Sequence, residues 1–335
     1  MNRISRGQFA ALLLITDAFA LFCLMGSISL MTVIGFAAAT VIQVIMAVPA
    51  VKFYKNGGTL KNSGKAAELF YLIYLILWGG LLFVMLWNGA EVIYIPYDNF
   101  GIIPGKLLIS GLIAITCLYA SSPGLKSLSR AGFIAAALGT FCIAIVVISA
   151  LFGAEWSNLA ESGNMKGFVE ELSRGFVLSG GLGSFVVLLG FTKGDIVKNV
   201  RFYFTGKLIL LTAVTSAAVL VAGGIMEITD FPIVTAAQLS QPFSSQRIDS
   251  LFLIIFVILA VFAISVQTVS ASYLLERTVP SVKRFRSTII LVMMIGAAFL
   301  LSGINTYTPV YAFITVGVLL IVPTVMLIKK SKGGQ

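Results

Sequence analysis

The sequence predicts an all-α integral membrane protein with about ten transmembrane helices. Of its 335 residues, 59% are hydrophobic and only 11% are charged. A soluble domain carries about 25% charged residues, and its own surface must face water. The mean hydropathy of +1.02 is likewise that of a chain that lies largely in a lipid bilayer.

A transmembrane helix needs about 20 mostly apolar residues, and the sequence contains ten runs close to that length. These runs are 8–26, 29–50, 69–95, 102–120, 131–152, 175–192, 205–226, 250–273, 287–304 and 307–328. The first two are joined by the short junction 26–29, which is the least well-defined boundary. The first run also resembles a signal peptide, but with nine runs behind it we expect an uncleaved helix.

The positive charges fix the expected orientation of these helices. With the N-terminus in the cytoplasm and alternating spans, 19 of the 23 lysines and arginines fall on the cytoplasmic side. Only Lys106, Lys166, Arg174 and Arg247 fall outside. This is the bias of multi-pass membrane proteins, whose cytoplasmic loops are rich in Lys and Arg, so both termini are expected inside. The net charge of +10 therefore indicates topology and not a nucleic-acid partner.

Ten spans divide into two halves of five, 1–152 and 153–335. Because each half has an odd number of spans, the second half enters the membrane from the opposite side. This is the arrangement of an inverted-topology repeat, which is common in secondary transporters. In such folds the binding site lies at interrupted helices in matching positions of the two halves, which here are spans one and six.

Two segments carry the polar or flexible residues that an interrupted helix needs. Span six contains the run S-G-G-L-G-S at 179–184, in which Ser179, Gly180, Gly181 and Gly183 are candidate ligand-binding residues. Each glycine costs about 1 kcal/mol of helix propensity relative to alanine. The alternative for these glycines is close helix packing.

Span one carries Asp17 beside Thr16, near the predicted middle of the membrane. A carboxylate there costs about 2.5–3.5 kcal/mol on the insertion scale and should have a partner. It is interpreted as a contact for a substrate amine, a proton or a cation; the alternative is a structural hydrogen bond. Gln267 and Ser270 share one face of span eight and are further candidates, although such side chains usually join helices.

The residue inventory argues against an enzyme. The chain has no histidine, and Cys23, Cys117 and Cys142 lie singly within apolar runs. No nucleotide-binding, hydrolase or metalloprotease motif is present, so no cofactor and no metal site is predicted.

Three short segments resemble the spore permease family, the B subunits of spore germinant receptors. They are I-S-R-G-Q at 4–8, the stretch from Leu189 through Lys193, Asp195 and Lys198 to Lys207, and R-I-D-S-L-F at 247–252. Each motif is short, and their shared order along the chain carries the resemblance.

The resemblance implies an amino acid–polyamine–organocation (APC) transporter fold with broken helices one and six. It implies a role in sensing a germinant, often an amino acid, in the spore inner membrane, with an A subunit and a lipoprotein C subunit as partners. Carried over, the ligand site falls on Thr16, Asp17, Ala18, Ala20, Gly180, Gly181 and Gly183.

The sequence leaves open what such a site does. A receptor subunit and a secondary transporter of amino acids or amines, coupled to H⁺ or Na⁺, need the same kind of site. A scaffold with a vestigial site is a third alternative.

Overall fold

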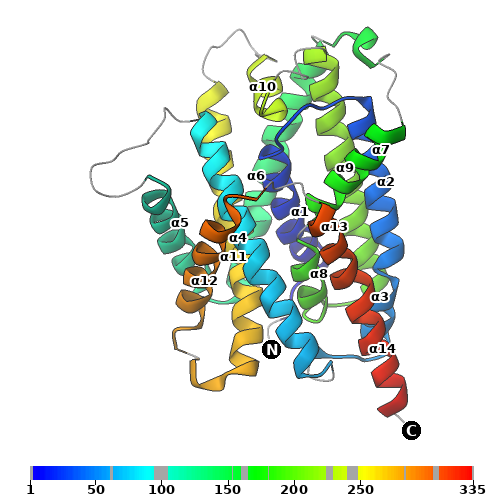
Figure 1. Ribbon diagram of the computed structural model, residues 1–335, viewed down its shortest axis with the longest axis vertical. Helices are drawn as coiled ribbons and strands as arrows, with labels where there is room; N and C mark the ends of the chain where they lie inside the picture. The colour runs from blue at the N-terminus through cyan, green and yellow to red at the C-terminus, as the bar shows by residue number, and fades with distance from the viewer. Residues whose placement is uncertain are drawn as a thin grey trace.

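The computed structural model describes residues 3–60, 63–93, 105–152, 154–159, 165–179, 181–223, 229–239, 248–282, 284–304 and 309–333. Within these residues the chain is helical apart from turns and one isolated backbone bridge. The helices stand roughly side by side in one bundle, and both termini lie at the same end of it (Figure 1).

The described residues up to Phe152 include six α-helices. In chain order they are α1 (Arg6–Phe22), α2 (Leu30–Met46), α3 (Val48–Lys55), α4 (Lys65–Ile93), α5 (Gly105–Ser121) and α6 (Leu125–Phe152). Pro49 lies in the first turn of α3, where its missing N–H is tolerated, and α2 and α3 together form one span, Leu30–Lys55.

The second half begins with the short helix η2 (Trp156–Leu159) and continues through eight α-helices. They are α7 (Met165–Val177), α8 (Leu182–Leu189), α9 (Ile196–Ala222), α10 (Pro232–Leu239), α11 (Ile248–Thr278), α12 (Arg286–Leu301), α13 (Pro309–Val316) and α14 (Val322–Gly333). The short helix η5 (Pro280–Val282) precedes α12, and the π-helical turn η6 (Gly317–Ile321) joins α13 to α14.

Every predicted span overlaps a helix or a helix pair of this bundle. Six described helical spans are long and apolar enough to cross a membrane, and a seventh is the bent pair of α7 and α8. α5 and α12 are shorter apolar helices, and the first predicted span corresponds to the 17 residues of α1. The division into two halves at residue 152 stays a prediction, although α6 does end at Phe152.

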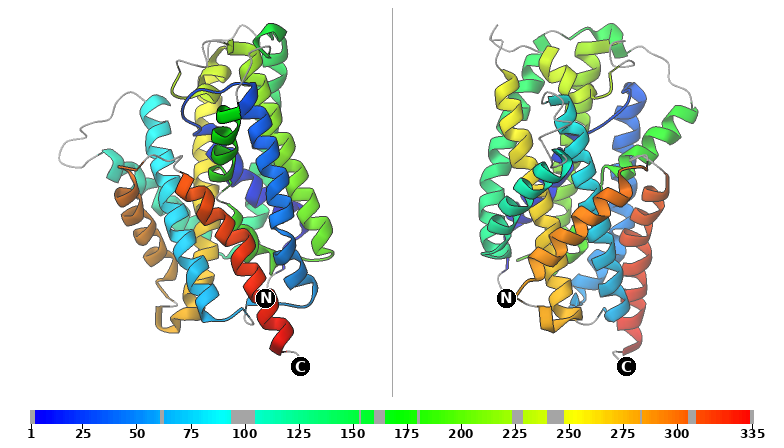
Figure 2. Two further views of the ribbon diagram at one scale, coloured as in Figure 1. Left: turned by 45° about the vertical axis from the view of Figure 1, so that its right-hand side comes forward. Right: turned by 60° about the vertical axis from the view of Figure 1, so that its left-hand side comes forward.

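α1 runs through the middle of the bundle, as Figures 1 and 2 show from three sides. It packs against α6, α9 and α11, and 13 of its 17 residues are buried. Ser5 caps its start in a reciprocal capping box with Gln8. Because protein surrounds it, α1 can carry polar side chains at membrane depth.

The connection between α1 and α2 is longer than the sequence suggested. α1 ends at Phe22 and α2 starts at Leu30, so residues 23–29 link them, and Gly26 adopts a positive φ of 84°. The amide of Gly26 donates to the carbonyl of Asp230, 2.9 Å away. The prediction of an almost loop-free junction at 26–29 was therefore wrong.

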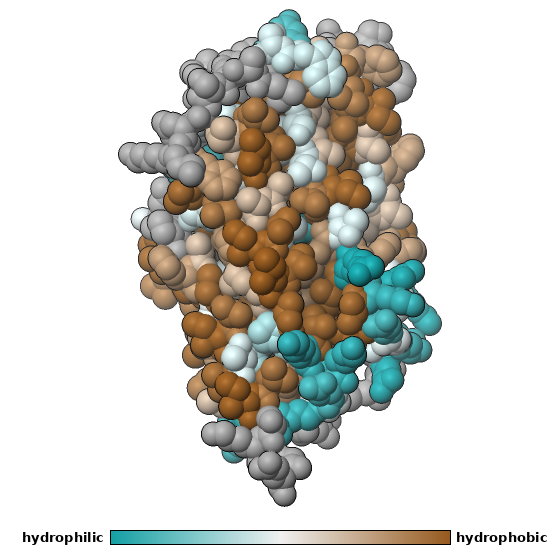
Figure 3. Space-filling model, turned by 90° about the vertical axis from the view of Figure 1, so that its right-hand side faces the viewer, coloured by the Kyte–Doolittle hydropathy of each residue, from teal (hydrophilic) through white to brown (hydrophobic). Residues whose placement is uncertain are grey.

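The basic residues gather at the end of the bundle that holds the termini, which we call the basic end. The residues near helix ends there are Arg6, Lys52, Lys65, Lys126 and Lys198. Lys106, the second residue of α5, lies at the opposite end. In Figure 3 hydrophilic residues gather at the lower right of one face, and most of the other coloured residues are hydrophobic. This asymmetry fits the predicted topology; which side of a membrane the basic end faces stays a prediction.

Candidate functional site

The predicted interruption of span six is present in the structure. α7 ends at Val177, α8 begins at Leu182, and the two helix axes are bent by 45°. Ser179 and Gly181 lie in the break, while Gly180 lies outside the described residues. The glycine-rich sequence accounts for the break, because glycine weakens a helix and opens its backbone.

Span one is not interrupted at the residues where the sequence predicted the break. Residues 16–20 form continuous helix, and α1 ends only at Phe22. A non-helical segment, Cys23–Ser29, then follows. Asp17 consequently projects from a regular helix, and it does so opposite the break of the second half.

Asp17 forms a buried ion pair with Lys207 of α9. Its Oδ1 atom lies 3.5 Å from the Lys207 Nζ atom, and the two side chains are 1% and 0% exposed. Tyr203, one helical turn before Lys207, donates a hydrogen bond from its hydroxyl to Asp17 Oδ2 at 2.7 Å. Asp17 therefore has the partners that a carboxylate at membrane depth requires.

The ion pair is linked to the helix break through Ser179. Lys207 Nζ donates to Ser179 Oγ at 2.7 Å, and Gln43 Nε2 of α2 donates to the same oxygen at 2.8 Å. Ser179 in turn donates to the carbonyl of Gly175, 2.7 Å away. We call Asp17, Lys207, Tyr203, Ser179 and Gln43 the central polar cluster.

The central polar cluster retains acceptor capacity within the described part of the chain. Gln43 Oε1 is buried and has no hydrogen-bond partner there, and Asp17 Oδ1 has the ion pair with Lys207 at 3.5 Å but no hydrogen bond. Both atoms are therefore suited to a ligand that brings N–H or O–H donors. A group of three or more His, Cys, Asp or Glu side chains that might hold a metal ion is absent from the described residues.

The structure brings only part of the predicted site together. Gly181 lies against Thr16 and Asp17, because a Cβ placed on it would be 3.4 Å from Thr16 Cγ2 and 3.8 Å from Asp17 Oδ1. The Thr16 hydroxyl bonds back to the Leu12 carbonyl of its own helix at 3.1 Å. Thr16, Asp17, Ser179 and Gly181 thus meet at the break.

Three other predicted residues do not face the central polar cluster. Ala18 lines an apolar groove between α1, α6 and α9. Ala20 is fully buried in the hydrophobic core. Gly183 packs against the ring of Tyr74, whose Cδ1 and Cε1 atoms would lie 2.4 Å from an added Cβ. Gly183 therefore serves close helix packing, which was the alternative interpretation of these glycines.

The two candidates on α11 occupy separate places. Gln267 Oε1 accepts a hydrogen bond from Ser184 of α8 at 2.8 Å, so it joins helices. Ser270 lies nearer the basic end, where it lines a small pocket. Within the described part of the chain, neither side chain is hydrogen-bonded to the central polar cluster.

Lys207 and Tyr203 were not among the predicted site residues. Span seven was predicted to start at residue 205 and Lys207 to lie among the cytoplasmic charges, which was wrong. α9 begins at Ile196, so Lys207 lies about 16 Å along the helix from its start. The signal was available: Tyr203 and Lys207 are four residues apart and share one helix face.

Comparisons with known proteins now bear on this geometry. No model of a protein family matches the chain. No curated protein matches it either. Solved structures of transporters do match in fold.

The structure of Mhp1, a nucleobase-cation-symport-1 family transporter in a closed conformation with bromovinylhydantoin bound, matches with a TM-score of 0.57 and 14% identity. The match covers 91% of this chain and 73% of that one. The inward-facing conformation of Mhp1 matches with a TM-score of 0.53 and 16% identity, over 96% and 78% of the two chains.

A Na⁺-coupled sialic acid symporter in a substrate-bound, outward-open state matches with a TM-score of 0.53 and 12% identity. That match covers 88% of this chain and 72% of the symporter. The chain therefore has the APC/LeuT-type fold of multi-pass membrane transporters, as the sequence predicted. The membership in the germinant-receptor family, its A and C subunits and the spore location stay predictions that rest on short motifs.

Proposed function

We propose that the protein is a secondary transporter of a small amine or amino acid, coupled to H⁺ or Na⁺, whose ligand binds at the central polar cluster. The observation that carries this proposal is the buried Asp17–Lys207 pair, placed directly beside the break between α7 and α8. The fold shared with Mhp1 and the sialic acid symporter supports it.

Lys207 acts in this proposal as a cation that the protein supplies itself. Its ammonium lies 3.5 Å from Asp17 Oδ1. The Asp17 carboxylate is the group that would attract a proton, a sodium ion or a substrate ammonium. Any of these cations competes with Lys207 for Asp17. When one of them binds, Lys207 retains Ser179 as its hydrogen-bond acceptor, 2.7 Å away.

This competition supplies a physical basis for coupling. A ligand shifts a conformational equilibrium only by its different affinity for the two states. If cation binding at Asp17 separates α1 from α9, it weakens a contact that closes the site. All five side chains of the central polar cluster are buried, at 1% exposure or less, so the bundle must open before a ligand reaches them. The break between α7 and α8 is a suitable hinge for that motion.

The experiment is uptake of radiolabelled amino acids and amines into proteoliposomes, with binding measured on the same protein in detergent. Accumulation that an ionophore dissipates supports coupled transport. Imposing the Na⁺ and H⁺ gradients separately identifies the coupling ion. Absence of gradient-driven uptake across the substrate panel would refute the proposal.

The same samples test the sensing hypothesis. Binding without accumulation would favour a receptor that uses a transporter fold, as the sequence resemblance implies. Asp17→Asn should abolish both binding and uptake if the central polar cluster is the site. A matched control is Asp195→Asn, which changes a carboxylate at the start of α9, outside the cluster.

A further inference from the structure

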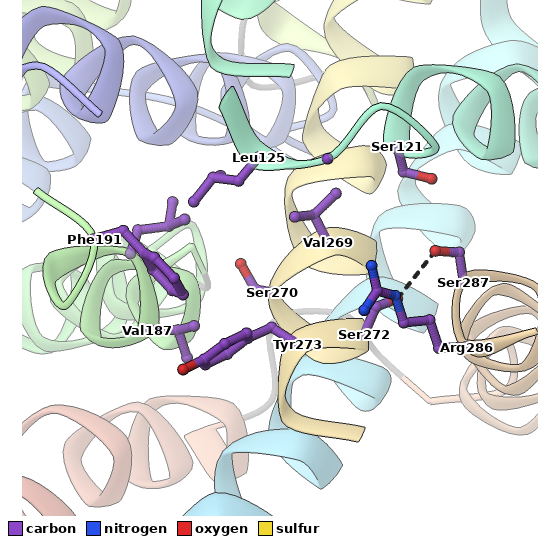
Figure 4. Close-up of a pocket in the computed structure, with 12 residues that line it drawn as sticks. Ser121, Leu125, Val187, Phe191, Val269, Ser270, Ser272, Tyr273, Arg286 and Ser287 are labelled. Atoms are coloured by element: carbon purple, nitrogen blue, oxygen red, sulfur yellow. Dashed lines mark hydrogen bonds between the residues drawn. The ribbon is translucent and has the colours of Figure 1, made fainter. Parts of the chain in front are cut away.

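A second polar pocket lies at the basic end of the bundle, remote from the central polar cluster along α11. It encloses about 120 Å³ between α8, α11 and the starts of α6 and α12. Its polar lining comes from Ser270, Ser272 and Tyr273 of α11 and from Arg286 and Ser287 of α12, with Phe191 on the opposite wall (Figure 4).

Ser270 is the residue of this pocket that points to a ligand. Its side chain is buried, with 1% of the residue exposed, and its Oγ atom has no hydrogen-bond partner within the described residues. Figure 4 shows its hydroxyl directed into the space between Leu125 and Phe191. A buried hydroxyl of this kind normally has a partner, so its isolation suggests that the pocket is built to hold one.

The electrostatics of the pocket favour an anion on the side where Ser270 lies. α6 begins at this lining, with Leu125 as its first residue. The positive end of its helix dipole, with the amide groups of the first turn, therefore lies on the same side of α11 as the Ser270 hydroxyl (Figure 4).

Ser272, Ser287 and Arg286 form a separate group on the other side of α11. Ser270 and Ser272 are two residues apart, so their side chains leave the helix on opposite sides, as Figure 4 shows. Ser272 donates to Ser287 at 3.3 Å, as the dashed line in Figure 4 marks, and Arg286 is ion-paired with Glu276. These three residues are therefore not part of the site at Ser270.

We propose that this pocket binds a small oxyanion, such as phosphate or a short carboxylate, through Ser270 and the first turn of α6. The pocket of about 120 Å³ gives room for an anion of a few heavy atoms. A bound anion bridges α11 to α6 and lies against the end of α8.

The test is anion binding to the purified full-length protein in detergent. Phosphate and acetate are titrated separately at fixed pH, against sodium chloride of equal ionic strength. Calorimetry gives the affinity, and the unfolding temperature gives an independent readout because a ligand of the folded state raises it. A saturable effect of phosphate or of acetate is expected, and the more effective anion identifies the ligand's chemistry.

Three variants show whether the effect arises in this pocket. Ser270→Ala removes a hydroxyl that has no hydrogen-bond partner among the described residues, so the unfolding temperature without anion should not change. The affinity for the anion should fall about tenfold. Ser270→Val should abolish binding by filling the space. The control Ser302→Ala removes a hydroxyl at the other end of α12, which bonds only to the carbonyl of Phe299 at 2.9 Å, and should bind as the wild type does.

Two results would overturn the proposal. One is that neither phosphate nor acetate has an effect beyond that of chloride. The other is that Ser270→Ala and Ser270→Val bind the effective anion as tightly as Ser302→Ala does. Either result is independent of transport, so it leaves the proposed function of the central polar cluster untouched.

Discussion

Lys207 of α9 and Asp17 of α1 form a fully buried ion pair, with their Nζ and Oδ1 atoms 3.5 Å apart. The two residues are far apart in the chain and meet in the middle of a helical bundle. Burial of two opposite charges contributes little net stability, but removal of one of them leaves the other uncompensated. Substitution of either residue should therefore affect the stability of the fold as well as the candidate site.

Removing either charge alone should destabilise the protein strongly. We expect Asp17→Asn and Lys207→Gln each to lower the free energy of unfolding by about 3–5 kcal/mol, because each leaves one buried charge without its partner. The double variant should lose less than the sum of the two. Reversible unfolding in mixed micelles measures all three, and the double-mutant cycle isolates the coupling energy. Purely additive losses would mean that the two side chains do not interact.

Sodium should partly replace the missing ammonium in Lys207→Gln. That variant leaves Asp17 without a counter-charge, so a small cation that reaches the carboxylate gains a site. We expect NaCl to raise the unfolding temperature of Lys207→Gln more than choline chloride does, and by a larger margin than in the wild type, where Lys207 competes for Asp17. The double variant Asp17→Asn/Lys207→Gln is the control without a carboxylate. If it responds to sodium as Lys207→Gln does, the ion binds elsewhere.

The helices could be predicted from the sequence because lipid imposes a simple rule. Each span must be long and apolar, and the basic residues collect at one end. This rule predicted ten spans, and each of them overlaps a described helix or helix pair; six described spans, or seven with the bent pair, are long and apolar enough to cross a membrane. The glycines predicted the break beside Ser179 and Gly181. The rule fails at Lys207, because a lysine near the edge of an apolar run also fits a loop, and the composition of one segment does not reveal a partner on another.

Only part of the candidate site could be predicted from the sequence: Asp17 could, but its partners Tyr203 and Gln43 could not. Asp17 is conspicuous as a lone carboxylate in an apolar span, whereas Tyr203 and Gln43 are ordinary in a membrane helix. Gly181 and Gly183 are indistinguishable by residue type, yet one lies on Asp17 and the other on Tyr74. Which face of α8 meets which neighbour depends on the tertiary packing.

These two glycines should respond in opposite ways to substitution. Gly183→Ala puts a Cβ 2.4 Å from the ring of Tyr74, which stacks on Trp78 and has little freedom to move. We expect a loss of about 1–3 kcal/mol from this overpacking. Gly181→Ala places its Cβ 3.4 Å from Thr16, an ordinary contact, and should fold normally.

A larger side chain at the same position tests the binding site. Gly181→Leu should leave insertion in the membrane intact while its bulk reaches Asp17 and blocks ligand binding. Binding in detergent and uptake in proteoliposomes measure this effect, and the unfolding temperature checks that the variant folds. Normal binding by Gly181→Leu would place the ligand elsewhere than at the break.

Arg174 should be the most important single residue for holding α7 against the segment between α1 and α2. The residue is 7% exposed and donates to the carbonyls of Ser27 at 2.9 Å and Met25 at 2.6 Å, while it pairs with Glu171 one turn earlier. Arg174→Met leaves two carbonyls and a nearly buried carboxylate without this partner. We expect a loss of about 3–5 kcal/mol in unfolding free energy.

The matched control for Arg174 is Lys106→Met at the same end of the bundle. Lys106 pairs with Glu91 at 3.4 Å, but both side chains are more than 40% exposed. Water and salt screen such a pair, so its loss should cost at most about 1 kcal/mol. Arg174→Lys should fall between the two, because an ammonium keeps the charge but cannot reproduce the fork of the guanidinium. Equal losses for Arg174→Met and Lys106→Met would show that the burial of Arg174 contributes nothing, and that residues 23–29 are held by other contacts.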